Sequence, residues 1–150
     1  MKKKRLFFIS ILIISIINVH PLFAASPPSL TKLTLNDVTD THQKNRIFQS
    51  IDLGKLDLTE IDLSKFSFHN SSLKGTILKR SGLADVLLVA TDLSNSSLQK
   101  AEMTGLKSYT SNFIKADMRN AQMTCVVIIS GIMTGADLSD AILSFGIIRN

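Results

Sequence analysis

Few residues in this sequence have types and spacings that suit chemistry. His69 follows Asp62 by seven residues, and a histidine with a carboxylate can perform general acid–base catalysis. Asp117 and Asp137 could share a cation through their oxygens, and the only cysteine, Cys125, could act as a free thiol. No metal-binding His pair, phosphate loop or nucleophile elbow is present. We therefore predict no enzymatic activity, no metal and no cofactor.

These side chains lie on a framework with a period of five. From Phe48 to Ile148 a large apolar residue stands at every fifth position, and Ser108 is the one exception. This spacing matches neither the helix period of 3.6 nor the strand period of 2. A second, usually smaller residue lies two positions before each large one, and the rest are mostly acidic, Ser, Thr, Asn, Lys or Gly. Such a fixed period indicates a repeat protein.

The repeats resemble a known family. Residues 116–120 (ADMRN) and 136–140 (ADLSD) are similar to the consensus of the pentapeptide-repeat family, Ala-(Asp/Asn)-Leu-x-x. The resemblance implies an all-β fold, a right-handed quadrilateral β-helix with four pentapeptides per coil. The large residue and the smaller one before it would then fill the interior. The expected rod has about five coils and a length of roughly 25 Å.

The sequence departs from the repeat pattern in two places, and each departure leads to a structural prediction. The early repeats place large residues at the small position, which predicts a wider and less regular first coil and a half: Ile51, Leu56, Ile61 and Phe66. In a coil of 20 residues Ser108 stacks between Leu88 and Ile128, and its partner position holds the large Leu106. The two volumes have been exchanged, and cores tolerate such exchanges when total volume is kept.

Residues 1–25 differ from the repeats in composition. Residues 2–5 are basic, an apolar run follows from Leu6 to Val19, and residues 24 and 25 are alanines. This pattern predicts a cleaved secretory signal peptide. The run of about 14 residues is shorter than the roughly 20 that cross a bilayer, but an uncleaved membrane anchor is the alternative. We expect the protein to be exported to the periplasm or the medium.

The rest of the sequence has two parts and almost no net charge. Residues 26–45 predict a spacer and N-terminal cap, with degenerate repeats as the alternative, and residues 46–150 carry the repeats. Four of the 17 basic residues lie in the first five positions, which leaves 13 against 12 acidic residues. The near balance argues against a nucleic-acid partner. A single cysteine allows no internal disulfide, but Cys125 could pair between chains.

Stacking the repeats in fours predicts an apolar surface on one side of the rod. None of the acidic residues that precede core positions falls on this side. A contiguous apolar patch usually marks an interface. The alternatives are that residues 30–45 fold back over the patch, or that strand surfaces tolerate such residues. The predicted interaction residues are Leu87, Val89, Tyr109, Val127 and Ile129.

A second predicted surface lies at the end of the repeats. Phe145, Ile147 and Ile148 fall in the last, incomplete coil with no polar capping segment after them. Repeat arrays normally need capped ends, and related pentapeptide proteins often dimerise through one end of the rod. We therefore expect either an end-to-end homodimer or a frayed, monomeric terminus.

These features favour a non-enzymatic interaction or structural scaffold protein with an unknown protein partner. A secreted effector delivered to a host or rival cell is the alternative, and contact with a membrane is expected only through an uncleaved anchor. Some members of the family mimic DNA and bind gyrase, which protects it from quinolones. That function requires a strongly negative rod in the cytoplasm, and both the charge balance and the predicted export argue against it.

Overall fold

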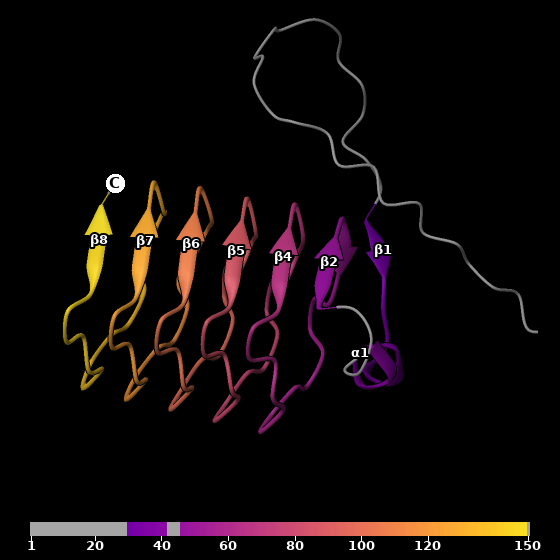
Figure 1. Cartoon of the computed structure of the whole chain (residues 1–150), viewed down its shortest axis with the longest axis horizontal. Helices are drawn as coiled ribbons and strands as arrows, with labels where there is room; N and C mark the ends of the chain where they lie inside the picture. Colours follow the sequence, from indigo (N-terminus) through magenta and orange to yellow (C-terminus); the bar gives the residue numbers. More distant parts are fainter. Residues whose placement is uncertain (1–29, 42–45, 150) are drawn as a thin grey trace, which may run out of the picture.

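The computed structural model describes residues 30–41 and 46–149. Six short parallel strands lie side by side in one sheet, as the row of arrows in Figure 1 shows. Each strand has three residues, and its middle side chain points into the protein. The strands are β2 (Ile47–Gln49), β4 (Ser67–His69), β5 (Leu87–Val89), β6 (Lys107–Tyr109), β7 (Val127–Ile129) and β8 (Ile147–Arg149).

The strand register repeats every 20 residues. Phe48 pairs with Phe68, and Phe68 pairs in turn with Leu88. Isolated parallel bridges with the same offset, such as Asp57 to Ile77, connect the coils on the other three sides. Four pentapeptides therefore complete each coil, and the solenoid predicted from the sequence is confirmed.

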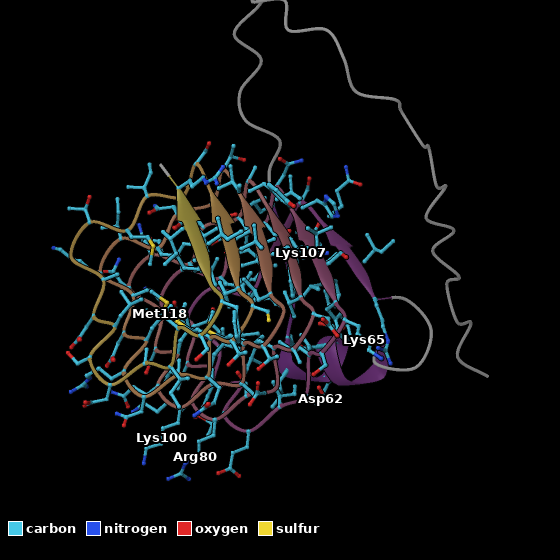
Figure 2. All side chains as sticks on the ribbon, turned by 60° about the vertical axis from the view of Figure 1, so that its left-hand side comes forward. Asp62, Lys65, Arg80, Lys100, Lys107 and Met118 are labelled. Carbon is cyan, nitrogen blue, oxygen red and sulfur yellow. The ribbon has the colours of Figure 1, made fainter. Side chains whose placement is uncertain are left out.

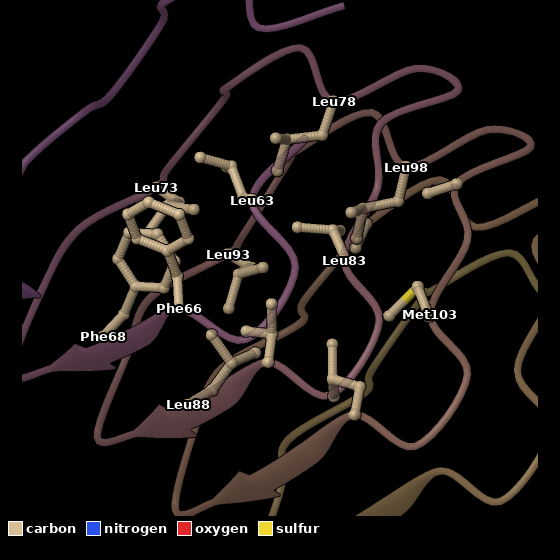
Figure 3. Close-up of a cluster of buried hydrophobic side chains, with 14 of the residues drawn as sticks. Leu63, Phe66, Phe68, Leu73, Leu78, Leu83, Leu88, Leu93, Leu98 and Met103 are labelled. Carbon is tan, nitrogen blue, oxygen red and sulfur yellow. The ribbon is translucent and has the colours of Figure 1, made fainter. Parts of the chain in front are cut away.

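The core is built from the large residues of the period. In Figure 3 the leucines from successive sides of the coil converge on the interior, and each is at most 3% exposed. Small residues two positions earlier fill the corners between them, because both side chains point the same way along an extended segment. Leu106 and Ser108 are both buried, so the exchange of volume predicted there is present.

The first coil contains an aromatic cluster. Phe66, at the position normally held by a small residue, is fully buried and packs against both Phe48 and Phe68, with ring centres 5.6 and 6.4 Å away. The rings of Phe48 and Phe68 also contact each other, at 5.3 Å. Ile51 is also buried, whereas Leu56 and Ile61 pack against the core from partly exposed positions. The early repeats thus place their extra volume partly in the core and partly at its edge.

The segment before the repeats combines a strand with a helix. β1 (Thr31–Lys32) pairs with β3 (Ile51–Asp52) in the same 20-residue register, so the stack has about six turns where the repeats alone predict five. Helix α1 (Leu35–Thr41) follows, and its Val38 is fully buried against the core. The described part of this segment thus contains one strand in the register of the coils and one helix packed on the core.

The start of α1 is fixed by a reciprocal pair of hydrogen bonds. The Thr34 amide donates to Asp37 Oδ2 at 2.7 Å, and the Asp37 amide donates to Thr34 Oγ1 at 3.4 Å. This arrangement satisfies amides that a helix N-terminus otherwise leaves unpaired. No helix among residues 30–41 and 46–149 is long and apolar enough to cross a membrane. The predicted signal peptide lies outside the described residues.

Candidate functional site

The outer side of the six-stranded sheet is the candidate interaction surface, which we call the strand face. The residues before and after each strand centre point outward, so that they form two columns along the rod. The first column is Ile47, Ser67, Leu87, Lys107, Val127 and Ile147, and the second is Gln49, His69, Val89, Tyr109, Ile129 and Arg149.

The register brings together all five residues predicted to interact. Tyr109 pairs with Val89 on one side and Ile129 on the other, while Leu87 and Val127 flank Lys107. Tyr109 is 39% exposed and the four aliphatic residues are half-buried between neighbouring strands. Ile47 and Ile147 also point outward on this side and are exposed. Ile147 extends the apolar set beyond Val127, whereas the polar Ser67 and His69 separate Ile47 from it.

The absence of acidic residues from the strand face has a structural cause. On the other three sides the acidic residue before the core position accepts a hydrogen bond from the amide two residues later. Asp52 accepts from the Gly54 amide at 2.7 Å, and Asp62 accepts from the Ser64 amide at 2.9 Å. On the strand face the backbone stays extended through this position and forms no such turn. Acidic residues are therefore missing from the side on which no turn amide is available for them to bind.

The N-terminal segment does not cover this surface in the described part of the chain. β1 and α1 lie at the β2 end of the rod, as Figure 1 shows. β1 pairs with β3 rather than with any strand of the six-stranded sheet. The alternative that residues 30–45 fold back over the patch is thus wrong for residues 30–41.

The isolated polar residues do not form a reactive centre. Asp62 belongs to the side that bridges to Gly82, whereas His69 stands on the strand face. Asp117 and Asp137 stack as expected. Arg119 contacts both, with Nη2 at 2.9 Å from Asp117 and Nε at 3.7 Å from Asp137. No cluster of three or more His, Cys, Asp or Glu side chains able to hold a metal ion occurs among the residues that the structure describes.

The arginine and the turns also set the ionisation of these carboxyl groups. Hydrogen bonds from Arg119, helped by the Gln99 amide, lower the pKa of Asp117. Hydrogen bonds from Ser139 lower the pKa of Asp137, and those from Thr59 lower the pKa of Asp57. The same turns that place these acidic residues thus favour their charged forms.

The lowered pKa values predict a loss of stability in acid. A carboxyl group whose pKa is lower in the folded than in the unfolded chain stabilises the fold above its unfolded pKa, about 3.9 for Asp. This contribution disappears as the pH falls through the folded pKa. We expect a melting temperature that is nearly constant from pH 7 to 5 and falls below about pH 4, as measured by circular dichroism. In Asp117→Asn the melting temperature should fall less steeply below pH 4 than in the unchanged protein. The same fall in both proteins would contradict the contribution of Asp117.

Cys125 lies at the corner that borders the strand face, two residues before β7. It is exposed and has a left-handed backbone with φ of 57°. Every fifth residue along the coils has this conformation, including 17 non-glycine residues. Its position is therefore explained by the repeat geometry, and pairing between chains remains a prediction.

The last coil exposes more apolar surface than the sequence prediction named. Phe145 is 87% exposed, and Ile147 and Ile148 are 43% and 41% exposed. Ile132 and Ile142 are also exposed, at 54% and 46%. Both occupy columns that hold polar or small residues in the earlier coils, such as Asp92 and Glu102. This break in the pattern was visible in the sequence.

Comparisons with known proteins agree with the fold. Residues 110–144 match the family model for pentapeptide repeats, described as eight copies. No curated protein sequence matches this chain. A trypsin-treated variant of QnrB1, a plasmid-mediated fluoroquinolone resistance protein, has a similar structure with a TM-score of 0.50 at 18% identity. That alignment covers 78% of this chain and 70% of the QnrB1 chain.

Two further solved structures are similar to parts of the chain. A pentapeptide repeat protein from the Arabidopsis thaliana thylakoid lumen is 17% identical over 66% of each chain, with a TM-score of 0.47. HetL, a pentapeptide repeat protein involved in heterocyst differentiation regulation in the cyanobacterium Nostoc, is 21% identical, with a TM-score of 0.33. That alignment covers 65% of this chain and 49% of HetL. The family match over 110–144, together with the 20-residue register from β2 to β8, identifies this chain as a pentapeptide-repeat protein.

Proposed function

We propose that this protein is a non-enzymatic interaction protein whose strand face binds a protein partner. The carrying observation is the contiguous apolar set formed by Leu87, Val89, Tyr109, Val127 and Ile129 on one side of the rod. Isolated apolar residues on a surface are ordinary, but a continuous patch bordered by polar residues usually marks an interface.

The rigidity of the strand face supports this proposal. Backbone hydrogen bonds join β5, β6 and β7 to the strands on both sides, and their buried middle residues anchor the sheet to the core. Outward side chains are therefore held in fixed positions before a partner arrives. Such preorganisation lowers the entropy that must be lost on binding.

We also propose that the protein is exported, with the periplasm or the medium as its location. Support comes from the basic start, apolar run and alanine pair of residues 1–25. Delivery to another cell as an effector is the alternative, and cell fractionation distinguishes the two. Fluoroquinolone resistance, the role of QnrB1, is less favoured. The common fold carries no function at 18% identity, and 13 basic against 12 acidic residues leave no strong negative charge.

The partner-binding role is tested by placing charge on the strand face. The double variant Val89→Asp with Ile129→Asp should lose the partner captured by the tagged protein from periplasmic and medium fractions, because two carboxylates would have to be desolvated there. The matched control is Ile77→Asp with Ile132→Asp, two exposed isoleucines off the strand face in columns that contain Asp.

Circular dichroism must show that both double variants are folded before capture is compared. We expect the control variant and the unchanged protein to capture the partner, and the strand-face variant not to capture it. A folded strand-face variant that captures the same protein to the same extent would refute the proposal.

Analytical ultracentrifugation of Phe145→Asp separately tests the proposed end-to-end homodimer, since the exposed Phe145 lies on the predicted contact.

A further inference from the structure

The strand face has the dimensions of one α-helix. Six strands spaced about 4.8 Å apart give a length of about 24 Å, and three residues per strand give a width of about 10 Å. A helix of about 16 residues has the same length, and its diameter with side chains is about 10–12 Å. Two columns of outward side chains border the middle line along which such a helix would lie.

The charge on the strand face is positive and unbalanced. Lys107 is exposed near the middle, between Leu87 and Val127, and Arg149 stands at the β8 end. None of the twelve outward positions is acidic. Asp85, whose carboxylate lies beside Gly105, is on the bordering corner, and no ion pair joins it to Lys107 in the described part of the chain.

Two arginines elsewhere on the rod have carboxylate partners within the chain. Arg80 forms an ion pair with Glu60 at 3.0 Å, and Arg119 is held between Asp117 and Asp137. In Figure 2 Arg80 and Lys100 project from a different side of the rod than Lys107. Lys107, like Lys100, has no ion pair among the described residues. Lys107 differs in its position in the middle of the apolar set, where its ammonium group can pair with a carboxylate from outside the chain.

We propose that the occupant of the strand face is an acidic amphipathic helix of about 16 residues presented by a partner protein. Its apolar stripe packs on Leu87, Val89, Tyr109 and the aliphatic residues of β7, and a flanking carboxylate pairs with Lys107. The helix proposal rests on the proposed function and specifies the chemical character of the partner. A second copy fits less well, because two strand faces would bring together only positive charges with no acidic group between them.

Tyr109 provides a direct probe of this site. The chain has one tyrosine and no tryptophan, so tyrosine fluorescence reports only on the strand face. The full chain is titrated with two stapled helical 16-residue peptides that lack Tyr and Trp. Both carry the same leucine stripe, but one has glutamates and the other lysines beside it. We expect the acidic peptide to bind about five- to tenfold more tightly at low salt, and less so at high salt.

Charge reversal tests the role of Lys107. Lys107→Glu should reverse the preference between the two peptides, and Lys107→Gln should abolish it. Lys100→Glu is the matched control, because it makes the same change on a different side of the rod and should leave the preference intact. Equal binding of both peptides, or a preference unchanged in Lys107→Glu, would overturn the proposal.

Other occupants give distinct results. Phosphatidylglycerol vesicles that change Tyr109 fluorescence when neither peptide does would assign the strand face to lipid. A concentration-dependent dimer that is lost in Val89→Asp with Ile129→Asp would assign it to a second copy. Either result overturns the helix proposal. If that double variant abolishes partner capture while the peptides show no charge preference, the proposed function stands and the acidic helix does not.

Discussion

Leu88→Ala should lower the free energy of unfolding by about 2–5 kcal/mol, towards the upper end of that range. Leu88 is the centre of β5, is 2% exposed, and stacks between Phe68 and Ser108. Truncation leaves a cavity whose cost depends on how well the neighbours can collapse into it. Ser108 is short, and the backbone of every coil is held by bonds to the next, so collapse should be limited.

The neighbouring leucine provides the control for this prediction. Leu87→Ala makes the same chemical change one residue earlier, but Leu87 points outward and is only half-buried. Its loss should cost less than about 1 kcal/mol, because few buried contacts disappear. Urea denaturation followed by circular dichroism measures both. Equal losses in the two variants would contradict the inward direction of Leu88.

Leu106→Ala should cost about 2–5 kcal/mol, and Ser108→Leu should largely restore the stability of that variant. Leu106 is 1% exposed and supplies the volume that Ser108 does not. Ser108→Leu alone should overpack the coil and cost about 1–3 kcal/mol. The double variant puts the large residue at the strand centre, as in the neighbouring coils, and a small residue two positions earlier, as Ala101 and Ala116 are on other sides of the rod.

The coupling between the two positions decides this second prediction. Denaturation of both single variants and the double variant gives an interaction energy, which should approach the sum of the two single losses, about 3 kcal/mol or more in favour of the double variant. Ser108→Ala is the control, because the buried Ser108 hydroxyl has no hydrogen-bond partner among the described residues. Its removal should be neutral or stabilising. Additive losses in the double variant would mean that the two side chains do not share one space.

Much of the site could be predicted because position in the period fixes direction in the coil. A segment that is extended at every core residue turns the flanking residues outward, so that Val89, Tyr109 and Ile129 had to align once the coil length was 20 residues. The same rule placed Ser108 in the interior although serine is usually exposed. Periodicity carried more information here than residue type.

Other features depended on contacts that periodicity does not encode. Val38 lies in a polar segment, and only its packing against the core identifies α1 as part of the N-terminal end. The sequence shows that the strand face lacks acidic residues, and this lack was read as a sign of an interface. The structure gives another reason for the lack. On the other sides, acidic residues such as Asp52 accept an amide hydrogen bond in a turn, and the strand face has no such turn.

The sequence by itself therefore determined the solenoid, the core and the alignment of the strand face, because a strict period of five repeated in fours leaves few other ways to bury the large residues. The tertiary structure decided which surfaces remain open. It placed α1 at the β2 end, set Arg119 between two carboxylates and left Lys107 without an ion pair among the described residues. Those outcomes depend on distances between groups in different coils and on backbone geometry at the corners. Neither quantity can be read from the order of the residues alone.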